Sequence, residues 1–284
     1  MITNNFGYHA PPDLDGVVAA LAEARGDVVV LGGGTMIIPD LTHGRASADV
    51  VVDLSRAGLS GIREEGDEVV VGATTTYTEV LSDDRAAALV PLLSTLSSGI
   101  TGGPQIRNKG TIGGSAAYAN PCSDVPACLV ALGARMRLAS AQGVREVPAE
   151  EFYTGAFATV RRRDEVLAAI VLPRPDGTAG YTKLKLAESS WPIVTAAVVS
   201  RPDGSLRVAI GAVAETPRLI DVEPPSAGVD DPAWRDHVRR AVAAAVPEPW
   251  SDLLADGAYR MRVAPAIVAR SVARALAAGG EETP

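Results

Sequence analysis

Glycine is the residue type that most suggests chemistry in this chain, because it gathers in a single short stretch. Residues 101–124, TGGPQIRNKGTIGGSAAYANPCSD, place five glycines among few bulky apolar side chains: Gly102, Gly103, Gly110, Gly113 and Gly114. Glycine allows close backbone approach, so such a segment can lie against a ligand and present its own N–H groups to it. On composition alone, an ordinary glycine-rich loop explains the stretch equally well.

A second glycine turn favours the ligand-binding interpretation. The run GGGT at residues 32–35 follows four β-branched or aliphatic residues, 28–31, and precedes the apolar segment 36–41. A buried strand that leads through a glycine turn into a short helix can receive a phosphate on its free amides. The turn is not a dinucleotide fingerprint, since Ile37 stands where G-x-G-x-x-G needs Gly or Ala, and it lacks the Lys of a Walker loop.

The elements that must position these loops are helices and strands in a mixed order. At 284 residues the chain is long enough for two or three compact domains. We expect strands at 28–31, 50–54, 68–73, 134–138, 166–172, 181–187, 191–200 and 206–214, and helices at 13–25, 76–81, 91–98, 124–132, 231–245 and 265–278. Asp13 and the Thr76/Glu79 capping box begin two of these helices. The last two helices are expected to cover one face of an antiparallel sheet, whose hairpin turns at residues 201–204.

Composition and charge exclude several functions. There are 26 Lys and Arg against 34 Asp and Glu, a net charge of −8, so affinity for nucleic acid is not expected. No apolar run is long enough for an integral membrane segment. Cys122 and Cys128 fit neither a zinc site nor a disulfide framework, which favours a reducing, cytoplasmic location. Two thiols also cannot hold several Fe–S clusters.

No catalytic constellation is visible in the sequence. The three histidines, His9, His43 and His237, are scattered and none lies in a glycine motif. There is no nucleophile–base spacing and no H-E-x-x-H. We therefore assign no catalytic residue and no metal ligand.

Taken together, the two glycine segments and the end of the chain resemble the FAD-binding medium subunit of the molybdenum hydroxylases, the group of carbon monoxide, nicotine and xanthine dehydrogenases. The matching text is VVLGGGTMIIPDL, QIRNKGTIGGSAAYANPCSDVPACLVALGARMRL and YRMRVAPAIVARSVARAL. It extends over essentially the whole chain.

The resemblance implies a fold and a domain order. The fold would be α+β, with two small αβ subdomains forming a PCMH-type FAD-binding domain, followed by a C-terminal domain of an antiparallel sheet with helices. The expected boundaries are 1–55 and 56–175 for the two FAD-binding subdomains and 178–280 for the C-terminal domain. The Pro/Gly cluster at 173–177 marks the last boundary independently.

The resemblance also implies a cofactor, partners and a role. Noncovalent FAD would be held with its pyrophosphate between the two loops, while molybdopterin and 2Fe–2S clusters would reside only on partner subunits. The partners would be an Fe–S small subunit and a molybdopterin large subunit, assembled as a heterotrimer that forms a dimer. This chain would take electrons from the clusters and pass them to an external acceptor. The cofactor-binding residues would be Leu31, Gly32, Gly33, Gly34, Thr35, Met36, Ile37, Ile38, Gly102, Thr111, Gly113, Gly114, Ser115, Asp124 and Lys183.

Three positions leave alternatives open. Asp124 could contact a hydroxyl of FAD or cap the helix that begins there, and the cap is the simpler interpretation. The family usually has Asn where this chain has Ser115, which offers one donor instead of two. Lys183 matches a family lysine that approaches the flavin, but the Arg usual a few residues later is replaced by Ala187–Glu188.

Two other functions fit the residues. A stand-alone FAD oxidoreductase of the same fold would turn over a substrate without partners, although the acid–base residues it needs are missing. An FAD-free scaffold that kept the glycine loops would be colourless. The absence of a nicotinamide fingerprint mildly favours a quinone, a cytochrome or oxygen as the electron acceptor over NAD.

Overall fold

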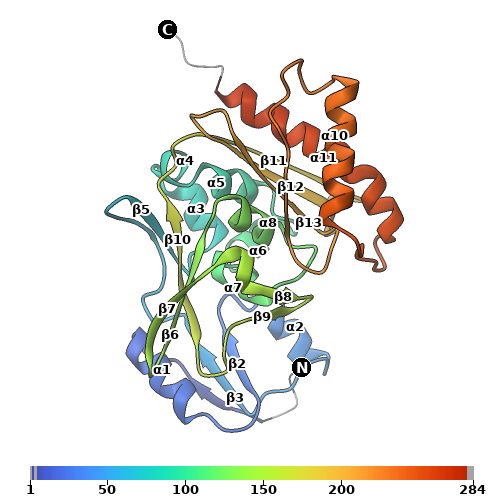
Figure 1. Ribbon diagram of the computed structural model, residues 1–284. Helices are drawn as coiled ribbons and strands as arrows, with labels where there is room; N and C mark the ends of the chain where they lie inside the picture. The colour runs from blue at the N-terminus through green and yellow to red at the C-terminus, as the bar shows by residue number, and fades with distance from the viewer. Residues whose placement is uncertain (1, 3–4, 280–284) are drawn as a thin grey trace.

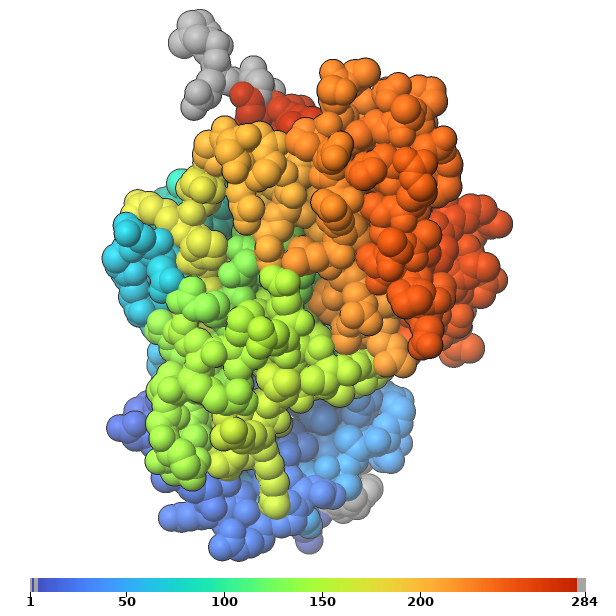
Figure 2. Space-filling view, in the orientation of Figure 1, coloured from blue at the N-terminus to red at the C-terminus, as the bar shows by residue number. Residues whose placement is uncertain are grey.

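The computed structural model describes residues 2 and 5–279, and it confirms the predicted α+β fold. The strands form three sheets, of three, five and four strands, and a small two-stranded hairpin. The N-terminal, middle and C-terminal segments follow one another along the long axis of the molecule (Figure 1). In the space-filling view the middle segment, in green, lies between the blue N-terminal and the orange C-terminal segments (Figure 2).

The N-terminal sheet is parallel and holds the first glycine loop at its edge. Its order is β1 (Gly7–His9), β3 (Val50–Asp53) and β2 (Val28–Leu31). Helix α1 (Leu14–Glu23) is capped by Asp13, as predicted, and α2 (Ile37–Thr42) follows the loop. Strand β1 was not predicted, because its three residues are all exposed and carry no hydrophobic alternation.

The middle sheet is antiparallel and lies beside a group of short helices. Its order is β4 (Ile62–Glu65), β5 (Glu68–Gly72), β10 (Val166–Pro173), β6 (Arg135–Ser140) and β7 (Gly143–Pro148). The helices are α3 (Tyr77–Ser82), α4 (Ala86–Leu89), α5 (Pro91–Ser98), α6 (Gly103–Arg107), α7 (Ile112–Tyr118), α8 (Asp124–Ala131) and α9 (Ala149–Phe152). The predicted capping box of Thr76 and Glu79 begins α3. A hairpin of β8 (Tyr153–Gly155) and β9 (Ala158–Thr159) precedes β10.

The C-terminal sheet is the predicted antiparallel meander, but both of its faces are buried. Its strands run in the order β11 (Thr178–Lys185), β12 (Pro192–Ser200), β13 (Leu206–Gly211) and β14 (Arg218–Ile220). Helix α11 (Gly257–Ala278), with α10 (Pro232–Ala245) beside it, covers one face, and α8 from the middle segment packs on the other (Figure 1). The continuous burial of residues 192–198 reflects this double cover.

Helix α11 corrects the prediction that the last helix begins at Pro265. It begins eight residues earlier, at Gly257, with Asp256 as its N-cap accepting a hydrogen bond from the Tyr259 amide. Proline interrupts helical hydrogen bonding, which is why the sequence suggested a start there. Ala264, Ile267 and other apolar residues on both sides of the proline are buried against the sheet, so packing maintains the helix through it.

A buried polar network fixes α11 to the rest of the molecule. Arg260 is fully buried and donates to the carbonyl groups of Ile193 and Ala212 and, at 2.5 Å, to Asp252 Oδ1. Burial by itself would raise the pKa of Asp252, but the hydrogen bonds it accepts, among them those from backbone amides and from the Cys122 thiol, lower that pKa to about 2. Burial raises the pKa of Cys122 to about 12, so this thiol stays protonated at neutral pH.

Each of the three larger sheets lies within one predicted segment, at residues 7–53, 62–173 and 178–220. The segments nevertheless share packing, since Tyr181, Ala197 and Ala209 belong to the same hydrophobic cluster as α5 and α8. The division into domains therefore stays a prediction. Over residues 2 and 5–279, none of the helices combines the length and apolarity needed to cross a membrane.

Candidate functional site

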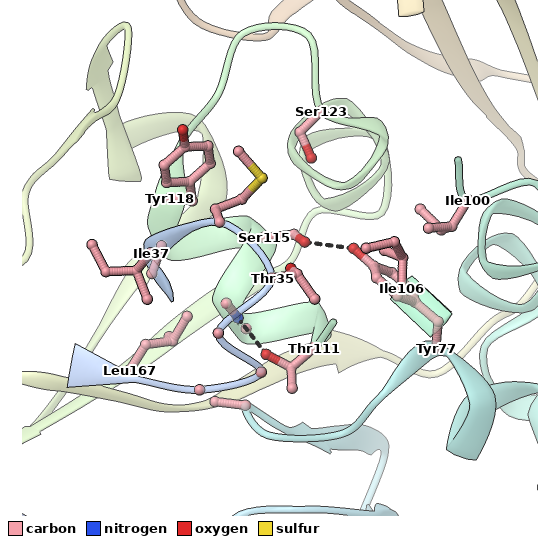
Figure 3. Close-up of a pocket in the computed structure, with 18 of the residues that line it drawn as sticks. Thr35, Ile37, Tyr77, Ile100, Ile106, Thr111, Ser115, Tyr118, Ser123 and Leu167 are labelled. Atoms are coloured by element: carbon pink, nitrogen blue, oxygen red, sulfur yellow. Dashed lines mark hydrogen bonds between the residues drawn. The ribbon is translucent and has the colours of Figure 1, made fainter. Parts of the chain in front are cut away.

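The two glycine loops line a single cavity of about 470 Å³. Residues 32–37 form one wall and residues 111–115, at the start of α7, form another. Figure 3 shows the first loop passing between Leu167 and Thr111, with Ser115 and Thr35 near the middle of the cavity. The convergence of two separate bends, which the sequence only suggested, is thus present.

The loops meet by direct backbone contact. A Cβ atom added at Gly33 would lie 1.7 Å from the carbonyl oxygen of Lys109, and one at Gly32 would lie 3.3 Å from Thr111 Oγ1. Gly34 has a φ of +74°, a conformation that side chains rarely adopt. Residue 33 must therefore be glycine for the first loop to contact the second.

The first loop leaves its amides open. Within the part of the chain that the structure describes, the N–H groups of residues 33–37 have no hydrogen-bond acceptor, and Met36 at the start of α2 has no side-chain cap. Unpaired backbone N–H groups at a cavity wall need a partner, and an anion such as a phosphate is the strongest acceptor for them. This loop can therefore bind a phosphate group with backbone atoms alone.

The second loop differs from the prediction that its amides would bind the pyrophosphate. The amide of Gly113 donates to the Ala73 carbonyl at 3.0 Å, and that of Ser115 donates to the Thr111 carbonyl at 3.0 Å. The Gly114 amide donates to Thr111 Oγ1 at 2.9 Å, so Thr111 is the N-cap of α7 (Figure 3). These three amides already have acceptors within the protein, so the second loop shapes the cavity wall, while the amides of residues 33–37 stay open.

Polar and apolar surfaces alternate along the cavity. In Figure 3, Ile37, Leu167 and Tyr118 lie at one end and Ile100, Ile106 and Tyr77 at the other, with polar Thr35, Thr111 and Ser115 between them. Two apolar ends separated by a polar centre suit a ligand with a ring system at each end and phosphates in the middle.

A buried tyrosine holds Ser115 in place. The hydroxyl groups of Tyr77 and Ser115 share a hydrogen bond of 2.5 Å, and Tyr77 is 3% exposed. Burial raises the pKa of the Tyr77 phenol well above its usual value, which keeps the phenol protonated at neutral pH. The Ser115 hydroxyl is therefore already engaged in a hydrogen bond with Tyr77, which fixes the position of the side chain.

Asp124 lies at the Ile100 end of the cavity in a buried ionic cluster. Its Oδ1 accepts hydrogen bonds from Tyr181 and, at 2.6 Å, from Lys183 Nζ, which also donates to the Gly99 carbonyl at 2.7 Å. Asp124 itself lines the cavity, and its Oδ2 accepts no hydrogen bond from the described residues. One carboxylate oxygen is thus held by the protein and the other is available to a ligand.

The structure corrects the prediction that Asp124 is the N-cap of its helix. The N-cap of α8 is Ser123, whose hydroxyl accepts from the Val125 amide at 3.5 Å, and Asp124 is the first residue of the helix. The Asp124 carboxylate instead accepts hydrogen bonds from Tyr181 and Lys183.

Most of the sequence-predicted residues meet at this cavity. It is lined by Gly32, Gly33, Gly34, Thr35, Met36, Ile37, Gly102, Thr111, Gly113, Gly114, Ser115 and Asp124. Leu31, Ile38 and Lys183 are not part of the lining formed by the described residues: Leu31 and Ile38 pack against Gly34, and Lys183 lies behind Asp124.

Sequence reasoning missed several lining residues, among them Tyr77, Arg161, Leu167 and Trp191. Tyr77 directly follows the capping residue Thr76, and Leu167 belongs to a strand that was predicted as buried. Arg161 gave no signal, because it begins a run of three arginines that is typical of a solvated loop. No group of three His, Cys, Asp or Glu side chains able to hold a metal ion occurs within residues 2 and 5–279.

Comparison with known proteins assigns the chain to a class. Residues 4–175 match the family described as the FAD binding domain in molybdopterin dehydrogenase. This match covers more than half of the chain and includes both glycine loops. The protein therefore belongs to this family of oxidoreductase flavoprotein domains.

Individual relatives extend the match to nearly the full length. The carbon monoxide dehydrogenase medium chain of Afipia carboxidovorans is 36% identical, over 98% of this chain and 99% of the relative. The glyceraldehyde dehydrogenase medium chain of Sulfolobus acidocaldarius is 34% identical over 68% of this chain and 71% of its own length. Among solved structures, carbon monoxide dehydrogenase from Hydrogenophaga pseudoflava superposes with a TM-score of 0.89 at 33% identity, covering 98% of this chain and 99% of the matched one.

Proposed function

We propose that the cavity between the two glycine loops binds FAD and that the chain is the electron-transfer flavoprotein subunit of a molybdenum-containing hydroxylase or dehydrogenase. The observation that carries this proposal is the row of open amides at residues 33–37, which lies between two largely apolar ends of one cavity. Family membership and the medium-chain relatives support it.

The residues fit the dinucleotide without a covalent link. The amides of residues 33–37 would bind the pyrophosphate, and Asp124 Oδ2 would accept a hydrogen bond from an N–H or O–H group of the cofactor at the Ile100 end. The isoalloxazine ring supplies the redox chemistry, accepting and donating electrons, so no acid–base pair of the chain is required. The residues that line the cavity would hold and orient the cofactor.

Partners complete the proposed enzyme. These relatives are medium chains of dehydrogenases, and the solved carbon monoxide dehydrogenase from Hydrogenophaga pseudoflava lacks the Mo-pyranopterin moiety of its molybdenum cofactor. We infer that this chain assembles in the cytoplasm with an Fe–S small subunit and a molybdopterin large subunit, as a dimer of heterotrimers. The substrate would bind on the large subunit.

Flavin content tests the binding step. The purified chain, extracted with acid and analysed by chromatography, should release about one FAD for each chain. A chain without FAD, or with FMN in its place, would contradict the proposal.

Reduction of the flavin tests the role. In the assembly purified with its partners, substrate should bleach the flavin absorbance under anaerobic conditions, whereas the isolated chain should not respond to the same substrate. Bleaching of the isolated chain would instead favour a stand-alone oxidoreductase.

A further inference from the structure

Arg161 is a cation in the cavity wall to which the proposed function assigns no role. It follows β9 and lines the cavity together with Val166 and Leu167, the first residues of β10. Its Nη1 donates to the carbonyl oxygens of Arg162 at 2.9 Å and of Glu165 at 2.7 Å. These two bonds hold the guanidinium group at the Leu167 end of the cavity.

The remaining donors of Arg161 are unpaired. Within residues 2 and 5–279, neither Nε nor Nη2 has a hydrogen-bond acceptor, and no carboxylate lies within 4.0 Å of the group. The nearby Glu165 carboxylate is taken by Arg145, at 2.6 and 2.9 Å, and by the Arg162 amide at 2.7 Å. Burial lowers the pKa of Arg161, although the Glu165 and Asp164 carboxylates act against this shift.

The opposite end of the cavity carries a carboxylate, which Lys183 pairs through one oxygen only. Asp124 lies next to Ile100, because Lys183 joins its carboxylate to the Gly99 carbonyl. A ligand that fits both ends needs hydrogen-bond donors near Asp124 and acceptors near Arg161.

The Ile100 end reaches the molecular surface at Trp191. Trp191 is 36% exposed there, and its loop is tied to Thr101 by the hydrogen bond from Thr101 Oγ1 to the Ser190 carbonyl at 3.2 Å. A redox-active ring must approach an external acceptor, so the isoalloxazine belongs at this end. The adenosine half then occupies the Leu167 end.

We propose that Arg161 binds acceptor atoms of the adenosine-diphosphate half, on either its adenine ring or its phosphates, and thereby makes the cavity select FAD over FMN. The inference rests on the proposed function and adds a specificity residue to it. A guanidinium group with free N–H groups on two nitrogens suits such acceptors, since charge-assisted hydrogen bonds are the stronger ones.

The test compares the flavin-free full chain with three variants. Arg161→Leu removes the donors and keeps an apolar packing surface, while Arg161→Lys keeps the charge. Arg162→Leu is the matched control, because it makes the same change of charge at the neighbouring residue, which does not line the described cavity. Dissociation constants are measured for FAD, FMN, ADP and adenosine, by flavin fluorescence directly and by competition for the two nonfluorescent ligands.

Arg161→Leu should weaken FAD and ADP roughly tenfold, leave FMN within twofold, and so reduce the selectivity by the same factor. Arg161→Lys should recover part of the loss, and Arg162→Leu should match the wild type. Weakened adenosine binding would place the contact on the adenine ring, and an effect on ADP alone would place it on the phosphates.

A purely structural role gives a different result. If Arg161→Leu lowers the melting temperature of the ligand-free chain but leaves the FAD and ADP constants within twofold, the inference is wrong. Equal weakening of FMN and FAD would overturn it as well. Failure of the wild-type chain to bind any flavin would instead remove the proposed function, which separates the two conclusions.

Discussion

The Lys183–Asp124 pair allows a quantitative prediction, because it joins β11 of the C-terminal sheet to the cavity. Lys183→Met removes the ammonium group 2.6 Å from Asp124 Oδ1 and 2.7 Å from the Gly99 carbonyl, in a pair whose side chains are 11% and 3% exposed. Removing one partner of a buried ion pair costs about 3–5 kcal/mol. Because Asp124 keeps the hydroxyl of Tyr181 and has Oδ2 at the cavity, we expect a loss of about 2–3 kcal/mol.

Urea unfolding of the flavin-free chain, followed by circular dichroism, measures this loss without the contribution of bound ligand. Lys185→Met is the matched control, since Lys185 lies on the same strand and pairs with Glu188, whose side chain is 98% exposed; its removal should cost less than about 0.5 kcal/mol. Adding Asp124→Asn to Lys183→Met should recover about 1–2 kcal/mol, because the unpaired charge is gone. A Lys183→Met variant as stable as the control, or additive losses in the double variant, would refute the reasoning.

Three further changes test the site and the fold. Gly33→Ala should reduce the flavin content to below about a tenth, because its Cβ would lie 1.7 Å from the Lys109 carbonyl oxygen. Gly7→Ala is the control and should retain all of the flavin, since its Cβ would meet no atom closer than 3.7 Å. Equal flavin contents in the two variants would contradict the loop contact. Asp252→Asn should cost roughly 2 kcal/mol of stability at pH 7, because the folded-state pKa of Asp252 is about 2, below the 3.8 of a free aspartate. This contribution to stability is present above pH 4 and is lost as the pH falls through 2. Acid titrations of the wild type and this variant should therefore converge near pH 2, and curves that stay apart would exclude the carboxylate as the cause. Ser123→Ala should lower the stability of the chain by about 0.5–1 kcal/mol in urea melts through loss of the α8 cap, and no loss would contradict that assignment.

Local signals in the sequence predicted local structure well. The Thr76/Glu79 pair begins α3, and the turn at residues 201–204 joins β12 and β13 in an antiparallel hairpin. These features succeed because each depends on hydrogen bonds among residues close in the chain. The resemblance to a known family supplied what local patterns could not, namely that the two glycine loops share one cavity.

Features that depend on distant contacts were beyond the sequence. Helix α8 comes from another segment and packs on the second face of the C-terminal sheet. The pattern of residues in the strands does not indicate which helix packs on that face. Local rules place the start of a helix at Pro265, but burial of α11 on the sheet continues the helix through the proline. Arg161 belongs to a run that is typical of solvent, and only the fold of the β8–β9 hairpin and β10 brings it to the cavity.

The glycines of the second loop line the cavity as expected, but their close packing gives them a different reason to be glycine. The expectation was that they clear a path for phosphates, yet a Cβ at Gly113 would lie 2.5 Å from both the Cβ and the carbonyl oxygen of Ala73, and one at Gly114 would lie 2.6 Å from Thr111 Oγ1. These positions are small because α7 packs closely on the end of β5 and on its own cap. A Gly114→Val substitution would therefore disturb the helix start before it met a ligand, and loss of flavin in that variant would not locate the phosphates. The first loop presents a continuous run of open amides, residues 33–37, at the cavity wall, so the phosphate assignment depends on these residues.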